Sequence, residues 1–201
     1  MAEMKMVIAA FDLDGTLTRR DTLIDFLIKT IGYQKLAMGL LANGPMLMKY
    51  LFGITPSEVA KQTLFAHFFQ GWRVEEFDTR CHAYSSSRLP YLLKGEALLR
   101  CEWHKKQGHR LVCVSASIRN WMAPWALQYG FGNVIATELE TDGGLITGRF
   151  QGRNCNGPEK VRRFLEIFPE RDRYTLFAYG DSEGDKELLS FADHAFFRQY
   201  R

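Results

Sequence analysis

Apolar residues occur along the chain in short runs that have the length of β-strands. The first run covers residues 6–11, and later runs cover 111–114, 133–137, 174–179 and 194–197. Continuous apolar runs of this length are typical of strands that are buried on both faces, as in a parallel sheet. We therefore expect five strands in one buried sheet.

Between these runs, apolar side chains recur at the three- and four-residue spacing of amphipathic helices. Such patterns begin at Ile118, Val161 and Asp185. Strands that alternate with helices predict right-handed crossovers, so the sequence indicates an α/β fold with a doubly wound, Rossmann-like parallel sheet. Ligands of such sheets bind at the carboxyl ends of the strands.

Residues 19–89 separate the first strand from the second and contain no strand-like run. Apolar residues in this stretch follow helical spacing, so we predict an inserted helical unit over 19–89. Residues 1–18 and 90–201 then form a discontinuous α/β core. Within that core, the glycine-containing segment 138–150 is typical of a β-hairpin.

One segment of the insertion, residues 36–54, is apolar over nearly the length that crosses a bilayer. Asn43, Pro45 and Lys49 interrupt it. Three interpretations remain open, namely a membrane span, a peripheral surface that contacts lipid or a lipid-like substrate, and ordinary packing between helices.

Composition narrows the class of protein. Hydrophobic residues make up 46% of the 201 residues and charged residues 24%, which is typical of a packed globular domain. The net charge of +3 is not gathered into a basic stripe, so we expect no nucleic-acid partner. The four cysteines form no CxxC pair and no signal peptide is recognisable, which favours free thiols in the cytoplasm. The sequence does not indicate the oligomeric state.

The first strand ends in the sequence FDLDGTLT, with Asp12 and Asp14 followed by Gly15. Gly15 permits a sharp turn of the backbone, so both carboxylates can be aimed at one site. Such a pair can divide its work, because one carboxylate attacks or binds a metal while its neighbour acts as acid and base. Solvated acids at a strand end are the structural alternative.

Two further carboxylates, Asp181 and Asp185, follow another strand in the sequence GDSEGD. Carboxylates with few histidines nearby favour Mg²⁺ over zinc. Ser115 is predicted to end a strand and begin a helix, where its hydroxyl and the following amides can bind a phosphate oxygen. Lys160 lies in the first turn of a predicted helix, where the helix dipole disfavours a cation unless it neutralises a phosphate and carboxylates.

The ordered set DxDGT, Ser115, Lys160 and GDxxxD resembles the haloacid dehalogenase superfamily, and the resemblance covers nearly the whole chain. The insertion after the first motif is similar to the helical C1 cap of subfamily IB, which includes phosphoserine phosphatases and phosphatidylglycerophosphate phosphatases. This resemblance implies a Mg²⁺-dependent phosphomonoester hydrolase whose substrate is a small or lipid-linked phosphate.

Residue roles follow from the same resemblance. Asp12 would be the nucleophile that forms an aspartyl phosphate, and Asp14 the general acid and base. Ser115 and Lys160 would hold the phosphoryl oxygens. Mg²⁺ would bind the carboxylates of Asp12 and Asp181 and the main-chain carbonyl of Asp14. Asp185 would bind the metal through water or pair with Lys160.

Substrate selection is expected in the insertion, where the sequence departs from phosphoserine phosphatases. Asp21 stands where those enzymes have a substrate-binding glutamate, and it either contacts substrate or caps the following helix. Ala116 follows Ser115 where they usually have glycine, and Arg88 is a candidate for a second anionic group. Two alternatives remain, a phosphotransferase acting on an alcohol and a lipid-associated protein with a vestigial site.

Overall fold

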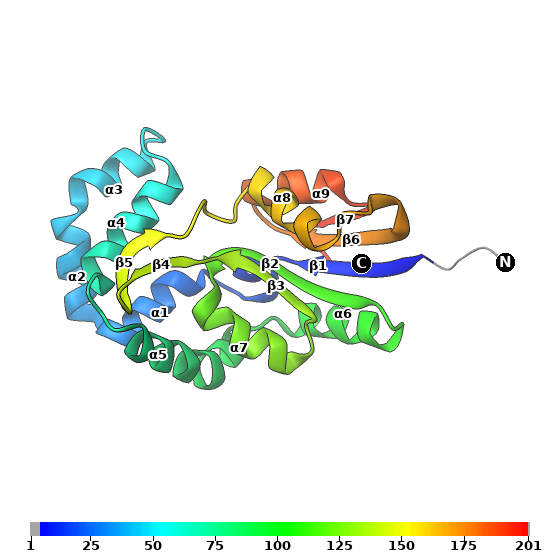
Figure 1. Ribbon diagram of the computed structural model, residues 1–201, viewed down its shortest axis with the longest axis horizontal. Helices are drawn as coiled ribbons and strands as arrows, with labels where there is room; N and C mark the ends of the chain where they lie inside the picture. The colour runs from blue at the N-terminus through cyan, green and yellow to red at the C-terminus, as the bar shows by residue number, and fades with distance from the viewer. Residues whose placement is uncertain (1–4, 201) are drawn as a thin grey trace.

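A computed structural model describes residues 5–200 and has a five-stranded parallel sheet at its centre (Figure 1). The strands lie in the order β3-β2-β1-β6-β7, which confirms the predicted doubly wound α/β fold. Their bounds are β1 (Met6–Phe11), β2 (Arg110–Ile118), β3 (Asn133–Thr137), β6 (Tyr174–Gly180) and β7 (His194–Phe197). The apolar runs therefore identified every strand of the sheet.

β1 lies in the middle of the sheet and is buried on both faces. Its side chains alternate between two hydrophobic clusters, with Ala9 and Phe11 in one and Ile8 and Ala10 in the other. The helices α6 (Gly95–Lys106) and α7 (Arg119–Tyr129) cover the first face (Figure 1). The second face is covered by α8 (Pro158–Ile167) and α9 (Lys186–Phe191). This double covering explains the continuous apolar run of the strand.

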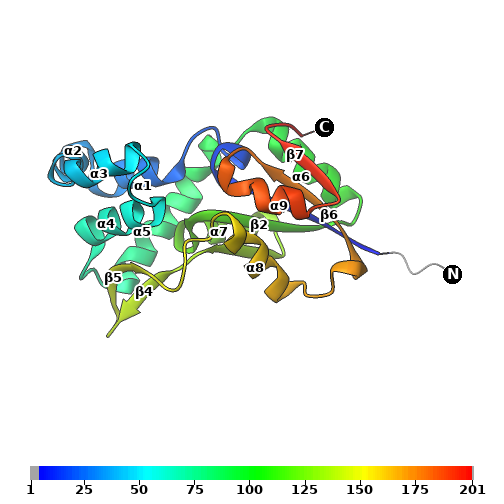
Figure 2. The ribbon, with the colours of Figure 1, turned by 90° about the horizontal axis from the view of Figure 1, so that it is seen from above.

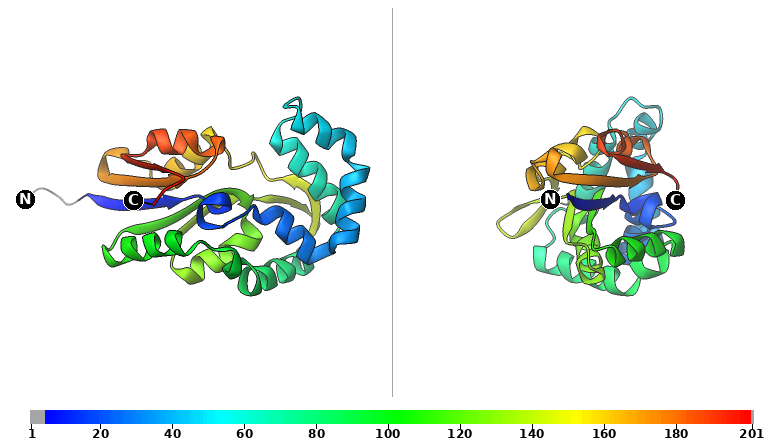
Figure 3. Two further views of the ribbon diagram at one scale, coloured as in Figure 1. Left: turned by 180° about the vertical axis from the view of Figure 1, so that it is seen from behind. Right: turned by 90° about the vertical axis from the view of Figure 1, so that its right-hand side faces the viewer.

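Five α-helices lie between β1 and α6 and form one end of the molecule, which we call the cap (Figures 1 and 3). They are α1 (Thr22–Ile31), α2 (Tyr33–Ala42), α3 (Gly44–Leu51), α4 (Ser57–Phe69) and α5 (Val74–Ser87). The chain leaves the core and returns to it at neighbouring points, because Thr18 pairs with Leu93 in an antiparallel bridge. The 3₁₀ turn η2 (Leu89–Leu92) precedes this return.

The apolar segment 36–54 forms parts of two helices that meet at Asn43. Within residues 5–200, no helix has the length and apolar character needed to cross a membrane. Leu36 and Gly39 of α2 are buried, whereas none of the eight residues of α3 is buried. Packing within the cap therefore uses only part of this segment.

The predicted hairpin forms from β4 (Leu139–Asp142) and β5 (Leu145–Phe150), and it packs against the cap helix α4. Gly148 makes this approach possible, because a Cβ atom there would lie 2.4 Å from the Cα of Ala66. Seen from above in Figure 2, the hairpin extends from the sheet beneath α4 and α5. It thereby joins the cap to the core.

α8 begins with a charged network that fixes its first turn. Glu159 is buried and accepts hydrogen bonds from Arg162 at 2.6 and 2.8 Å and from Arg163 at 2.8 Å. These bonds from Arg162, and then those from Arg163, hold the pKa of Glu159 at about 2, although burial opposes them. Arg163 also donates to the carbonyl of Ala136 in β3, so the network ties α8 to the sheet.

Replacing Glu159 with glutamine is expected to lower the free energy of unfolding by about 1 kcal/mol near pH 7. The folded pKa lies below the unfolded value, so the charged group stabilises the fold above about pH 4.5, and its contribution is lost as the pH falls toward about 2. Urea unfolding measured across this pH range should therefore show the free energies of unfolding of the unmodified protein and of Glu159→Gln becoming equal at low pH. Glu166→Gln, on the same helix and exposed, should change stability by less than about 0.5 kcal/mol. A difference in the free energy of unfolding that does not depend on pH would contradict a stabilising role for the ionised Glu159 carboxylate.

Candidate active site

The carboxyl ends of β1, β2 and β6 bring the predicted residues together. Phe11 is paired with Cys113 on one side and Tyr179 on the other, so Asp12 and Asp181 follow adjacent strands at the same edge. A cleft of about 390 Å³ opens there, between the core and the cap. Its lining includes Asp12, Asp14, Gly15, Asp21, Tyr50, Ser57, Lys61, Ser115, Ala116, Asn154, Asn156, Lys160, Asp181 and Ser182.

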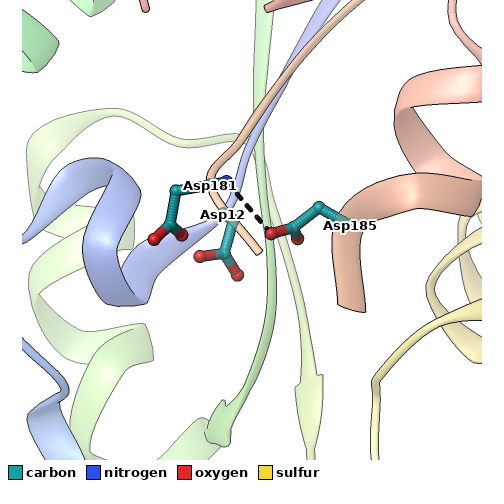
Figure 4. Close-up of side chains that lie close together, drawn as sticks. All are labelled: Asp12, Asp181 and Asp185. Atoms are coloured by element: carbon teal, nitrogen blue, oxygen red, sulfur yellow. Dashed lines mark hydrogen bonds between the residues drawn. The ribbon is translucent and has the colours of Figure 1, made fainter. Parts of the chain in front are cut away.

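Three carboxyl groups gather at this edge of the sheet. Asp12, Asp181 and Asp185 each offer an oxygen that lies within 4.8 Å of the others. Figure 4 shows the side chains of Asp12 and Asp181 directed into the same space, with the Asp185 carboxylate pointing toward them from the other side, from the 3₁₀ turn before α9. The predicted convergence of the two acidic motifs is therefore observed.

Lys160 is buried between two of these carboxylates. Its Nζ donates to Asp12 Oδ1 at 2.7 Å and to Asp185 Oδ1 at 2.5 Å. Burial lowers the pKa of Lys160, but the two carboxylates outweigh it and raise the pKa above its ordinary value. Burial raises the pKa of Asp12 to about 8, against the influence of Lys160. The lysine is thus held as a cation between Asp12 and Asp185.

Asp185 is engaged on both of its oxygens. Besides the bond to Lys160, its Oδ2 accepts from the Ser182 hydroxyl at 2.8 Å and from the amides of Ser182 and Asp181 at 3.0 and 3.2 Å. Burial raises the pKa of Asp185, but Lys160 and these donors bring it below its ordinary value. Asp185 therefore organises the loop and holds Lys160, which fits the second of its two predicted roles.

Asp14 is held separately, on the cap side of the cleft. The amide of Thr22 donates to Oδ1 at 2.7 Å, and the Ser117 hydroxyl donates to Oδ2. Burial, and then the charge of Asp21, raise the pKa of Asp14 above its usual range. A carboxyl group that is fixed in place and retains its proton more readily than usual is suited to acid and base work.

Gly15 lets Asp181 approach the first motif. Gly15 has φ +78°, and a Cβ atom there would lie 2.2 Å from Asp181 Oδ2. Thr16, the next residue, donates its hydroxyl to Asp181 Oδ1 at 3.2 Å. The DGT sequence thus provides both the space and the hydrogen bond that place Asp181 beside Asp12.

The residues of the cleft fit a magnesium ion. Four aspartates line it against two lysines, so a divalent cation would offset the excess of negative charge. Carboxylate oxygens are the donors that Mg²⁺ prefers. Asp12 and Asp181 are the better placed ligands, because no described residue donates a hydrogen bond to Asp12 Oδ2, whereas both oxygens of Asp185 are occupied.

Ser115 lies in the cleft, but the predicted helix does not begin there. β2 continues to Ile118 with a register shift after Ser115, and α7 begins at Arg119. The Ser115 hydroxyl accepts from the Ser117 amide at 3.1 Å, and this local bond favours a turn over a helix. The expected helix N-terminus at Ser115 was therefore wrong, although the serine lines the predicted site.

The three predicted substrate contacts lie in different surroundings. Asp21 accepts from the Leu23 amide at 2.7 Å as the N-cap of α1, and it also lines the cleft. Ala116 lines the cleft, and its carbonyl accepts from Lys61 at 3.3 Å. Arg88 instead binds the carboxylate of Asp25 through two bonds of 2.7 and 2.9 Å and lies outside the cleft lining. The prediction that Arg88 belongs to the site was therefore wrong, because its guanidinium pairs with the buried carboxylate of Asp25 inside the cap.

Several residues of the site were not predicted. In the sequence, Ser117 looks like an ordinary polar residue two positions after Ser115, but its hydroxyl donates a hydrogen bond to the Asp14 carboxylate. Lys61 enters the cleft from α4, and its neighbours on that helix, Glu58 and Gln62, accept from the amides of Asn154 and Phe150. The spacing of 58, 61 and 62 places them on one helical face, and that was the available signal.

The C-terminal segment also holds the acidic loops. The Tyr200 hydroxyl donates to the carbonyl of Thr16 at 2.5 Å, and Arg198 Nε donates to the carbonyl of Asp181 at 2.9 Å. Arg198 is the one described residue other than glycine with positive φ, at 55°. The loops that carry the two acidic motifs are therefore both tied to the C-terminal segment.

A doubly wound sheet with aspartates and a buried lysine at its strand ends, next to a helical cap, is the architecture of an α/β hydrolase. The haloacid dehalogenase-like hydrolase family matches residues 9–190. The chain therefore belongs to the haloacid dehalogenase-like hydrolases.

Individual relatives match most of the chain. Protein CicA of Caulobacter vibrioides is 34% identical over 196 residues, which are 97% of this chain and 87% of the relative. A Bordetella pertussis Tohama I protein of unknown function has a TM-score of 0.79 at 24% identity, over 93% of this chain and 87% of that one. A phosphoserine phosphohydrolase-like protein from Francisella tularensis has a TM-score of 0.64 at 18% identity, over 92% and 82%. These two structures share the fold.

Replacing Gly15 with alanine should reduce the affinity for Mg²⁺ at least about tenfold, because the new Cβ displaces Asp181. Gly53→Ala is the matched control, since Gly53 also has positive φ, at 71°, but has no atom within 4 Å of an added Cβ. Both variants incur about 1–2 kcal/mol of backbone strain. Calorimetric titration with Mg²⁺ checks the difference, and equal affinities in the two variants would refute the role of Gly15.

Proposed function

We propose that the protein is a Mg²⁺-dependent phosphomonoester hydrolase that acts through an aspartyl phosphate on Asp12, and that it belongs to subfamily IB. The observation that carries the proposal is the geometry around Asp12. One oxygen of its carboxylate is fixed by buried Lys160, and Asp14 is held by other donors in the same cleft. The site thus has a positioned nucleophile and a separate proton carrier.

In the first half of the reaction, an Asp12 carboxylate oxygen forms a bond to phosphorus as the ester oxygen leaves. Asp14 gives its proton to the departing alkoxide, so that the free alcohol is released. The raised pKa of Asp14 supports this step, because the group must arrive protonated. Lys160 and the Ser115 hydroxyl would bind phosphoryl oxygens, and their contribution is electrostatic.

In the second half, water attacks phosphorus and breaks its bond to the Asp12 oxygen. Asp14, now ionised, removes a proton from that water, which returns the site to its starting state with phosphate as the product. The Ser117 hydroxyl and Thr22 amide support both halves, because they fix the Asp14 carboxylate in either protonation state. Mg²⁺ would be held by Asp12 and Asp181 and would offset repulsion between the carboxylates and the phosphate.

The cap side of the cleft suggests the kind of substrate. Lys61 and Tyr50 come from cap helices, and Asn154 and Asn156 come from the core loop facing them. An ammonium and two amides suit a substrate with a second polar or anionic group beside its phosphate, whether that substrate is small or lipid-linked. Asp21 is engaged as a helix cap, which argues against the amine recognition expected of a phosphoserine phosphatase.

Transfer of the phosphoryl group to an alcohol shares the first half of this reaction and is the second candidate. Ser57 and Tyr50 bring two hydroxyl groups of the cap into the cleft, and these would bind the hydroxyl of an acceptor alcohol. Product analysis in the presence of added alcohols separates the two, because hydrolysis yields inorganic phosphate alone and transfer yields a new phosphate ester.

Asp12→Asn should reduce Mg²⁺-dependent phosphatase activity at least about a thousandfold, because an amide oxygen is a poor nucleophile. The assay is phosphate release from amino acid, sugar, nucleotide and lipid phosphomonoesters, and chelation of Mg²⁺ should also abolish it. Asp142→Asn, at the exposed turn of the hairpin, is the matched control and should retain full activity. Circular dichroism should show that both variants are folded. Unchanged turnover by folded Asp12→Asn would refute the nucleophile.

A further inference from the structure

The outer edge of the cap exposes large apolar side chains that the fold does not use. Figures 1 and 3 place α2 and α3 at one end of the molecule, and both helices contact α4. Each of the following side chains is between 50% and 80% exposed, and we call them the cap-edge patch: Met38, Leu41, Met48, Leu51, Phe52 and Ile54.

The patch has the spacing of helix faces. Met48, Leu51 and Phe52 lie at positions i, i+3 and i+4 and so share one side of α3 or its end, and Met38 and Leu41 share one side of α2. Because no residue of α3 is buried, packing inside the cap does not account for its apolar character. Exposed apolar side chains gathered on two helices that contact each other are typical of an interaction site.

The charged residues of the segment that carries the patch all have one sign. Residues 26–57 contain three lysines, Lys29, Lys35 and Lys49, and neither an acidic residue nor an arginine. Their charge equals the net charge of the whole chain, +3, so the rest of the protein is balanced. All three lysines are exposed. The positive excess of the molecule is therefore concentrated on the segment that carries the apolar patch.

We propose that the cap-edge patch docks on the surface of an anionic lipid bilayer. Apolar side chains would enter the boundary between headgroups and acyl chains, while the lysines would lie near lipid phosphates. A second copy of the chain is a poorer occupant, because a two-fold contact on the patch would bring its lysines together without acidic partners. Charge complementarity thus selects the anionic bilayer.

Docking would bring the cleft close to the bilayer. Tyr50 lines the cleft, and the next two residues, Leu51 and Phe52, belong to the patch. The docking proposal goes beyond the proposed hydrolysis and does not depend on it. Inactive Asp12→Asn should accordingly bind vesicles like the unmodified protein, so the two proposals can fail independently.

Sedimentation with vesicles tests the docking. The full chain should sediment with vesicles of phosphatidylcholine and phosphatidylglycerol, and much less with phosphatidylcholine alone. The double variant Leu51→Ser, Phe52→Ser should lower the affinity for the mixed vesicles at least about tenfold. Lys35→Gln with Lys49→Gln should lower it at least about tenfold and should weaken the preference for the anionic lipid.

Matched controls lie on α6 of the core. Leu99 is 73% exposed, as Leu51 is, and Lys106 is an exposed lysine, so Leu99→Ser and Lys106→Gln should leave vesicle binding unchanged. Thermal unfolding and hydrolysis of a soluble phosphomonoester should be unaffected in the patch variants. Full recovery of the protein in the supernatant would overturn the proposal. So would a stable dimer that dissociates in Leu51→Ser, Phe52→Ser, because a second copy would then cover the patch.

Discussion

Burial of the Lys160 ammonium between two carboxylates is the interaction on which the rest of the cleft depends. A buried ion pair is a weak source of net stability, because removing both charges from water costs several kcal/mol. Removing one partner is far more costly, since it leaves a charge buried without compensation. Without Lys160, the carboxyl groups of Asp12 and Asp185 would face each other in the interior. The network therefore specifies an arrangement of charges more than it contributes stability.

Each neighbouring feature keeps that arrangement in place. The bonds of Glu159 to two arginines fix the first turn of α8, from which Lys160 extends. The donors on the loop before α9 fix Asp185, and Gly15 leaves room for Asp181. Because β1 is the central strand and Phe11 pairs with Cys113 and Tyr179, Asp12 lies at the same edge of the sheet as Ser115 of β2 and Asp181 after β6. The topology of the sheet thus accounts for the convergence of motifs that are far apart in the sequence.

The core could be predicted from sequence because its signals are local. Strands that are buried on both faces appear in the sequence as continuous apolar runs. The motifs DxDGT and GDxxxD each contain both the aspartates of the site and a glycine. The cap residues of the cleft could not be predicted in this way. Lys61 reaches the site only because α4 packs against the hairpin. Arg88 lies outside the site because it pairs with Asp25, and nothing in the sequence indicates that pair. The role of Ser117 depends on a bulge in β2, because a helix starting at Ser115 would have placed its hydroxyl elsewhere.

The division of labour between Asp12 and Asp14 is the central claim, and chemical trapping tests it most directly. The protein would be mixed with Mg²⁺ and a phosphomonoester that it hydrolyses, quenched during turnover, and treated with hydroxylamine, which converts an acyl phosphate to a hydroxamate. Peptide mass spectrometry then locates the modification. The account predicts a hydroxamate on Asp12 that depends on both Mg²⁺ and substrate. A hydroxamate on Asp14, or turnover with no trapped aspartate, would contradict it.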